Sequence, residues 1–247
     1  MSGRPLVLGH RGMGTGDGEN TLLSLVRATQ VGADGVELDV HQTIDGVVVV
    51  THDSSLKRTM GVDLEIGGMT FRELKKMRLI GPEKLTTIEK VYVELPDKAF
   101  INVEIKDPRL AETLVPLISS FNALDRTLFS SFHHPCLLKI KKLHEDSLLG
   151  LLIGEDARGK DPITYFGELL TVYKPYSLNL PVQMFEEFGL EKGLGFIKLV
   201  RNMGIKVALW TLNDPELLLK IKGEIDIVIT DNLQGIMAAL GGKNSRR

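Results

Sequence analysis

Short apolar segments alternate along almost the whole chain with segments that have the apolar periodicity of amphipathic helices. The predicted strands are Leu6–Leu8, Val36–Val40, Ile101–Ile105, Thr127–Ser131, Leu148–Ile153, Tyr176–Leu180, Lys206–Trp210 and Ile225–Thr230. The helices predicted between and after them are residues 19–32, Thr86–Leu95, Pro108–Asn122, Pro135–Glu145, Pro162–Val172, Gly193–Met203, Pro215–Lys222 and Asn232–Leu240. Eight such pairs in 247 residues predict an α/β protein with a (β/α)8 TIM barrel, because a doubly wound sheet normally stops at about five to seven strands.

One stretch after the second predicted strand departs from this alternation. Asp45-Gly46 predicts a hairpin turn, after which Val47–Thr51 returns as another strand. Residues 54–85 then form a small insertion, rich in glycine, that can act as a flap over a site. We therefore expect one domain over residues 1–247, with this insertion after the second strand and a frayed tail over residues 241–247.

Carboxylates gather on two of the predicted strands. Glu37 and Asp39 alternate with valine and leucine, so in an extended strand both carboxylates point to one face and the apolar residues point to the other. Glu104 and Lys106 follow the same pattern on a second strand. Active sites of TIM barrels are built at the C-terminal ends of the strands. Because unpaired buried carboxylates are costly, we expect a cation between them.

Two interpretations of this cluster are equally supported by the residues alone. Glu37, Asp39 and Glu104 offer only oxygen ligands, and such ligands select one divalent cation, Mg²⁺ or Ca²⁺ with Mn²⁺ as a further option, over Zn²⁺. Alternatively, Lys106 or Arg11 neutralises the carboxylates in a structural ion network.

Two histidines lie just past apolar strands and beside these carboxylates. His10 follows the first strand, and His52 follows the hairpin strand and precedes Asp53. Histidine is the side chain best suited to move protons near neutral pH, so His10 and His52 are the candidate catalytic residues, with His41 ranked behind them. Trp210, the single tryptophan, ends a strand and either forms an apolar wall for a substrate or packs in the core.

Composition excludes several other classes of function. A net charge of −2 and a pI near 6.3 leave no basic footprint for nucleic acid. The single Cys136 excludes an internal disulfide. The N-terminus lacks the apolar core of a signal peptide and no apolar run is long enough to span a bilayer, so we expect a cytoplasmic protein without an integral membrane segment.

The first predicted strand is followed by a glycine-rich loop. Glycines at positions 12, 14, 16 and 18 suggest a dinucleotide-binding turn, with Glu37 as the ribose-binding acid. The spacing does not match G-x-G-x-x-G, because an acidic residue falls where the third glycine belongs. The loop is therefore predicted to be flexible rather than to bind a dinucleotide.

The ordered set of motifs resembles the glycerophosphodiester phosphodiesterase family from about Leu6 to Asn232. The matching segments are Gly9-His10-Arg11-Gly12, Glu19-Asn20-Thr21, Gly32-Ala33-Asp34, Val36-Glu37-Leu38-Asp39-Val40, Thr43 with Asp45-Gly46, Val49-Val50-Thr51-His52-Asp53, Leu56 with Arg58-Thr59, Asn102-Val103-Glu104-Ile105-Lys106, Trp210-Thr211-Leu212-Asn213 and Ile229-Thr230-Asp231.

Membership of this family implies a TIM barrel with a small insertion after the second strand. It also implies a divalent ion held by Glu37, Asp39 and Glu104, with His10 and His52 as acid and base. Arg11 and Lys106 are expected near the phosphate. The expected substrate is a small glycerophosphodiester, cleaved to glycerol 3-phosphate and an alcohol, and the sequence leaves open whether water or the glycerol 2-hydroxyl is the nucleophile.

Two alternatives to this function stay open at the level of sequence. A lysophospholipase D of the same superfamily would act on a diester with a long acyl chain and would need an apolar groove wider than Trp210 provides. A barrel without catalytic activity would serve as a binding module. The intact carboxylates and both histidines argue against the binding module.

Overall fold

Parallel strands close into a barrel in the computed structural model, which describes residues 3–16, 18–76, 85–157 and 159–241. In these ranges the barrel strands are β1 (Leu6–Gly9), β2 (Gly35–Gln42), β5 (Phe100–Ile105), β6 (Thr127–Ser131), β7 (Leu148–Leu152), β8 (Ser177–Pro181), β9 (Lys206–Trp210) and β10 (Ile227–Thr230). Each pairs in parallel with its neighbours, and β1 closes the ring by pairing with both β2 and β10. The predicted TIM barrel is confirmed.

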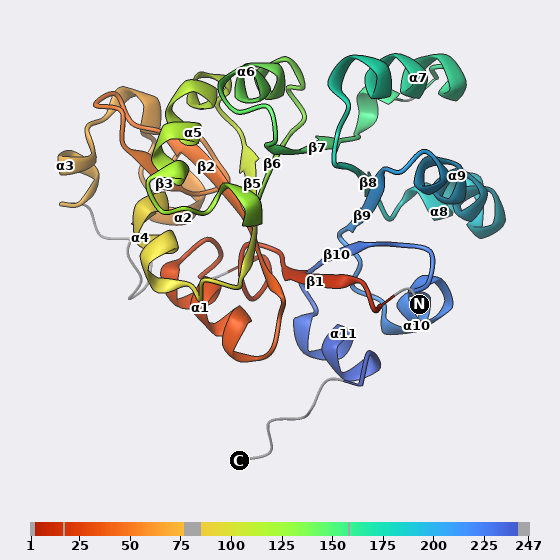
Figure 1. The fold of residues 1–247 in the computed structure, drawn as a ribbon. Helices are drawn as coiled ribbons and strands as arrows, with labels where there is room; N and C mark the ends of the chain where they lie inside the picture. Colours follow the sequence, from red (N-terminus) through yellow and green to blue (C-terminus); the bar gives the residue numbers. More distant parts are fainter. Residues whose placement is uncertain (1–2, 17, 77–84, 158, 242–247) are drawn as a thin grey trace.

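Helices surround this barrel (Figure 1). The α-helices in the described part of the chain are α1 (Leu22–Gln30), α2 (Lys57–Met60), α3 (Phe71–Leu74), α4 (Ile88–Glu94), α5 (Ala111–Ser119), α6 (Pro135–Leu143), α7 (Pro162–Tyr173), α8 (Met184–Phe188), α9 (Leu190–Asn202), α10 (Pro215–Ile221) and α11 (Leu233–Ala239). Several begin as predicted, with proline in the first turn of α6, α7 and α10. None of the described helices combines the length and apolar character needed to cross a bilayer.

Helices α9 and α5 begin at different residues from those that the sequence predicted. The helix predicted to start at Gly193 begins at Leu190, and the short α8 before it was missed. Gly189 separates the two with a φ of 82°, a conformation that glycine adopts easily. The segment predicted as one helix from Pro108 begins as a 3₁₀ turn, Pro108–Leu110, before α5.

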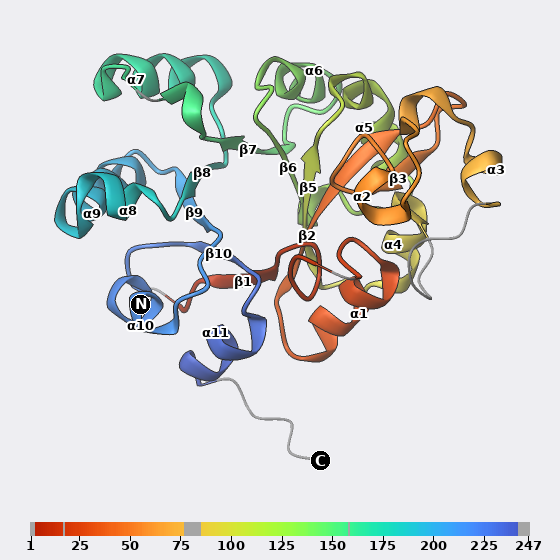
Figure 2. The same ribbon diagram turned by 180° about the vertical axis from the view of Figure 1, so that it is seen from behind.

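The excursion after β2 is attached to the barrel by antiparallel pairing. β3 (Val48–Val50) pairs with β2 as the hairpin turn predicted, and β4 (Thr86–Thr87) pairs with β3. Between these strands lie α2, the 3₁₀ turn η1 (Ile66–Gly68) and α3. Figure 2 shows α2 close to β3 and α3 at the outer edge of the molecule. Part of the predicted insertion, residues 77–84, and most of the predicted tail, residues 242–247, lie outside the described residues.

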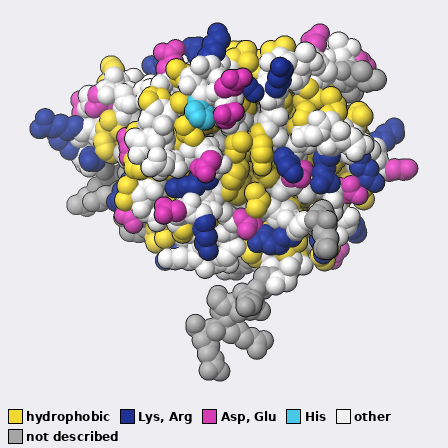
Figure 3. Space-filling model, viewed as in Figure 1, with side chains coloured by type: hydrophobic (Ala, Val, Ile, Leu, Met, Phe, Trp, Pro, Cys, Tyr) yellow, Lys and Arg dark blue, Asp and Glu magenta, His cyan; other side chains and the backbone are white. Residues whose placement is uncertain are grey.

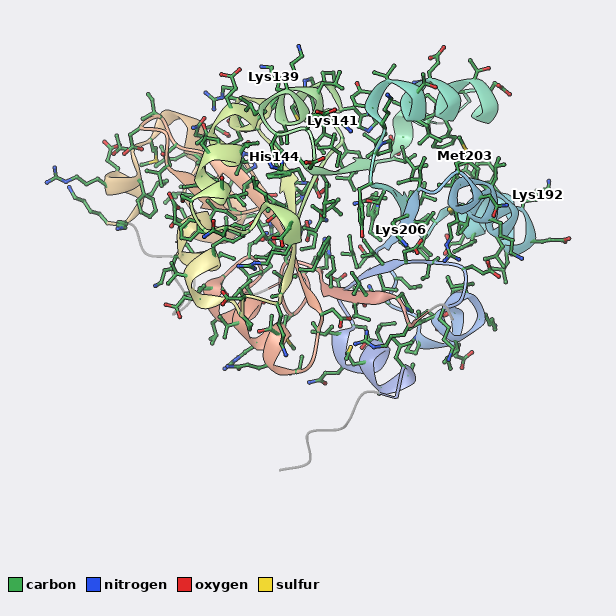
Figure 4. All side chains as sticks on the ribbon, in the orientation of Figure 1. Lys139, Lys141, His144, Lys192, Met203 and Lys206 are labelled. Atoms are coloured by element: carbon green, nitrogen blue, oxygen red, sulfur yellow. The ribbon has the colours of Figure 1, made fainter. Side chains whose placement is uncertain are left out.

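Apolar side chains of the barrel form two cores, one on each side of the barrel wall, and a third, smaller cluster of Val49, Leu56, Ile66 and Leu74 lies in the excursion after β2. Successive side chains of a strand point to opposite faces of the barrel wall, and this decides which core each residue joins. Val7 joins the large cluster between strands and helices, whereas Leu8 joins a smaller cluster with Ile227 and Ile229 inside the barrel. Figure 3 shows apolar side chains gathered at the centre of one end of the molecule. Figure 4 labels Lys206, the first residue of β9, in the same view, so this is the N-terminal end of the strands. The site described next lies at the opposite end.

Candidate active site

Three carboxylates from β2 and β5 meet near the C-terminal end of β5. The two strands are in register, with Asp39 opposite Glu104, and Glu37 precedes Asp39 by one inward-facing position. One carboxylate oxygen from each of these residues lies within 4.8 Å of the others, and all three side chains are buried. The sequence predicted this convergence from the alternation along each strand.

Burial and mutual repulsion disturb the ionisation of the three carboxyl groups. Burial, followed by the charges of Asp39 and Glu104, raises the pKa of Glu37 to about 8. Burial and the charge of Asp39 likewise raise the pKa of Glu104. Burial opposes ionisation of Asp39 as well, but Lys106 and Arg11 together lower its pKa below the ordinary value.

The donor set fits a hard divalent cation. Glu37 Oε1 is buried and has no hydrogen-bond partner among the residues that the structure describes. An orphaned buried carboxylate oxygen is costly, and a cation held by these oxygens would remove that cost. Because the ligands are oxygens only, Mg²⁺, Ca²⁺ and Mn²⁺ suit the cluster better than Zn²⁺.

Arg11 and Lys106 contact the same carboxylates. Lys106 Nζ lies 3.2 Å from Asp39 Oδ1 and donates to Glu104 Oε1. The backbone N–H of Arg11 donates to Glu37 Oε2 at 3.1 Å, and its side-chain Nε lies 3.3 Å from Asp39 Oδ2. The ion network expected as the alternative to a metal site is therefore present, but within the described part of the chain it leaves Glu37 Oε1 without a hydrogen-bond partner.

His10 lies between the carboxylate cluster and Asp231. Its Nδ1 is 2.8 Å from Asp231 Oδ1, and its Nε2 is 3.8 Å from Glu37 Oε2. Because a carboxylate only accepts hydrogen bonds, Nδ1 is the donor and Nε2 faces the cluster. Burial opposes the charged form of His10, but Asp231 and Glu37 outweigh it and raise the pKa of the imidazole.

His52, which follows β3, is held in a similar way, and β3 pairs with the same edge of β2 as β1 does. Its Nδ1 lies 2.6 Å from Asp53 Oδ1, and the preceding Thr51 N–H donates to the Asp39 carbonyl at 2.9 Å. His41, the third-ranked histidine, does not occupy a comparable place. Its Nε2 lies 2.9 Å from the backbone carbonyl of His52, so it supports the segment that carries His52.

Trp210 lies at the end of β9, across the barrel from β5. Its indole N–H donates to the Asn179 carbonyl at 3.0 Å, and Phe132 packs edge-on against the ring. Trp210 also borders a cavity of about 880 Å³. The cavity lies beyond the strand ends and is lined mainly by apolar side chains, among them Leu180, Pro181, Met184, Phe166, Phe188 and Phe196.

Two asparagines of the sequence motifs, Asn20 and Asn213, also belong to the site, and their roles there were not predicted. Asn20 donates from Nδ2 to Asp39 Oδ2 at 2.9 Å, and its Oδ1 accepts the Asp39 N–H at 3.2 Å. Its φ of 57° is tolerated by asparagine better than by most residues. Asn213 donates to Asp231 Oδ2 at 3.2 Å, and so fixes the partner of His10.

Comparisons with known proteins agree with this geometry. The family model described as "Glycerophosphoryl diester phosphodiesterase family" matches residues 10–234. A glycerophosphodiester phosphodiesterase of Caldanaerobacter subterraneus subsp. tengcongensis is 30% identical, over 93% of this chain and 95% of its own length.

Solved structures show the same likeness. The glycerophosphodiester phosphodiesterase of Thermotoga maritima has a TM-score of 0.81 and 38% identity, over 95% of this chain and 97% of that one. A phosphodiesterase of Oleispira antarctica, solved in complex with the product sn-glycerol-3-phosphate, has a TM-score of 0.79 and 26% identity, over 96% of this chain and 97% of that one.

The fold and the site define a TIM-barrel enzyme with an acidic centre at the C-terminal end of its strands. The family match covers most of the chain, including β2 and β5, which carry this centre. The chain belongs to the glycerophosphoryl diester phosphodiesterase family.

Proposed function

We propose that this protein hydrolyses glycerophosphodiesters to glycerol 3-phosphate and an alcohol, with a divalent cation as cofactor and His10 and His52 as acid and base. The observation that carries the proposal is a pair of carboxylate-supported histidines, His10 with Asp231 and His52 with Asp53, beside one buried carboxylate cluster. The Oleispira antarctica relative, which binds glycerol 3-phosphate as its product, supports the substrate class.

Glu37, Asp39 and Glu104 would hold the cation, which when bound supplies positive charge to the phosphoryl oxygens of the substrate. Arg11 and Lys106 add positive charge at the edge of the same cluster, where negative charge grows on the phosphoryl group during cleavage. Mg²⁺ and Ca²⁺ are the favoured ions, with Mn²⁺ as a third.

The two histidines divide the proton transfers. One takes the proton of the nucleophile as its oxygen bonds to phosphorus, and the other donates a proton to the alcohol oxygen as the P–O bond breaks. With water as nucleophile the products form in one displacement. With the glycerol 2-hydroxyl as nucleophile a cyclic phosphate forms first, and water then opens it; ³¹P NMR during turnover distinguishes the two.

The deciding experiment measures release of glycerol 3-phosphate from glycerophosphocholine and glycerophosphoethanolamine. We expect activity to disappear with EDTA and return with one of Mg²⁺, Ca²⁺ or Mn²⁺. His10→Ala and His52→Ala should each abolish turnover while metal binding, measured by calorimetry, is largely kept. Absence of turnover with every ion would refute the proposal, and loss of metal binding in the histidine variants would refute their role as acid and base.

The cavity beside Trp210 supports a second candidate, a lysophospholipase D activity. Its volume of about 880 Å³ is within the range of ligand sites, and its apolar lining suits an acyl chain better than a polar head group. A lysolipid placed with its phosphate at the carboxylate cluster would direct its chain past Trp210.

Phe188→Asp tests this second candidate, because Phe188 is exposed and lines the cavity. The substitution should lower kcat/KM for lysophosphatidylcholine and leave glycerophosphocholine unaffected. Val172→Asp, on an exposed position of α7 that does not line this cavity, is the control. A wild-type enzyme that prefers glycerophosphocholine and ignores lysolipids would exclude the activity.

A further inference from the structure

Arg58 connects the insertion after β3 to the loop that follows β1. It lies in α2, and its Nε donates to Asp53 Oδ2 while its Nη2 donates to Glu19 Oε1, both at 2.6 Å. A guanidinium presents these N–H groups as a rigid fork, which an ammonium group cannot reproduce. One side chain therefore joins two carboxylates that lie 34 residues apart in the chain, from position 19 to position 53.

The first of these carboxylates, Glu19, holds Arg11 in place. Its side chain is only 4% exposed. Glu19 Oε1 accepts from Arg11 Nη1 at 2.9 Å, and Oε2 accepts the Gly16 N–H at 2.9 Å. Burial opposes ionisation of Glu19, but Arg58, the Gly16 N–H and Arg11 together lower its pKa, so the carboxylate is charged where it meets both arginines.

The second carboxylate, Asp53, holds His52. One oxygen contacts His52 Nδ1 and the other accepts from Arg58, so removing the guanidinium frees the aspartate to rotate. Each acceptor of Arg58 therefore touches a residue of the proposed reaction. At the other end of the same loop, Thr15 N–H donates to Asp231 Oδ1, the oxygen that also contacts His10.

We propose that Arg58 is a positioning residue of the phosphodiester reaction: it orients His52 through Asp53 and Arg11 through Glu19. This inference rests on the proposed function. It makes the insertion a structural part of the active site, since the guanidinium comes from α2. Partners that orient catalytic groups are typically worth about 10- to 100-fold in activity, and we expect Arg58→Ala to lower kcat by that factor.

The test is a cycle of Arg58→Ala and Asp53→Asn with glycerophosphocholine as substrate. If Arg58 acts through Asp53, the loss in kcat from Arg58→Ala is much smaller in the Asp53→Asn background than in the wild type. Guanidinium ion added to Arg58→Ala should restore part of kcat. Arg58→Lys should have a lower kcat than the wild type, because an ammonium group does not reproduce the two hydrogen bonds of the guanidinium. Lys57→Ala removes a cation from the preceding, exposed position of α2 and should leave kcat unchanged.

The outcomes separate this inference from the proposed function. Additive losses would contradict the action of Arg58 on His52 through Asp53, and a lowered melting temperature with unchanged kcat would show that Arg58 is structural only; either result would overturn the inference. If the wild type turned over no diester, the proposed function would fail. The orienting effect of Arg58 on His52 would then be measured by the imidazole ¹⁵N resonances of His52. These resonances should shift in Arg58→Ala and stay unchanged in Lys57→Ala.

Discussion

His10 and Asp231 contact each other, Nδ1 to Oδ1 at 2.8 Å, although 221 residues separate them in the chain. His10 follows β1 and Asp231 follows β10, and these two strands pair in parallel where the barrel closes. Closure of the barrel therefore supplies the histidine with its carboxylate. The same Asp231 oxygen accepts the Thr15 N–H at 2.9 Å, so the glycine-rich loop, predicted to be flexible, is hydrogen-bonded to the strand end.

Asp231→Asn should lower kcat by about 10- to 100-fold, because the amide no longer fixes which nitrogen of His10 carries the proton. Steady-state kinetics with glycerophosphocholine measure the effect. Asp214→Asn is the matched control: Asp214 caps α10 at the same end of the barrel, and asparagine caps a helix equally well. Equal losses in the two variants would contradict a specific role for Asp231.

Removal of one ligand from the carboxylate cluster should abolish the stabilisation that divalent ions give. For the wild type, an ion at about 100 times its Kd raises the free energy of unfolding by about 2.7 kcal/mol. Glu104→Gln should lose most of this increase, and Glu112→Gln, on the exposed side of α5, should keep it. Thermal unfolding of EDTA-treated protein with Mg²⁺ or Ca²⁺ added back measures both. A wild-type melting temperature that no ion changes would contradict a metal site.

Gly14→Ala should disturb the loop that carries His10 and Arg11. Gly14 has a φ of 114°, and an added Cβ would meet the Asp231 carbonyl oxygen at 2.8 Å. We expect a loss of at least about 1 kcal/mol in stability together with a lower kcat. Gly16→Ala separates backbone strain from the clash with Asp231. The φ of Gly16 is also positive, at 116°, but nothing lies within 4 Å of its added Cβ. Equal effects of both substitutions would assign the whole effect to backbone strain.

Stability should fall at acid pH partly through Asp53. Burial opposes ionisation of Asp53, but hydrogen bonds from Arg58 and His52 lower its pKa to about 2. A carboxyl with a lowered pKa stabilises the folded state above its unfolded pKa of about 3.9, and this contribution is lost as the pH falls toward 2. Urea unfolding should therefore show that Asp53→Asn destabilises the protein at pH 6 and that the difference shrinks as the pH approaches 2. A difference that stays constant would contradict this linkage.

Much of the fold was predictable because barrel strands and their helices carry local signals. The alternation around Glu37 and Asp39 predicted both the strand and the inward direction of the carboxylates, and β2 confirms it. Helix boundaries were harder to predict where the local sequence signal is weak. The five-residue α8 carries too few residues to show a helical period, and it was missed.

The sequence by itself determined the (β/α)8 architecture and the chemical groups at the strand ends, since hydrophobic period and residue type are local properties. Only the tertiary structure decided how those groups are paired. Asp231 reaches His10 because the barrel closes, and Arg58 reaches Glu19 because the insertion folds back over the first loop. Such contacts depend on the path of the chain between distant segments, which no local pattern encodes. The structure therefore turned a set of strand-end residues into two supported histidines beside one acidic centre.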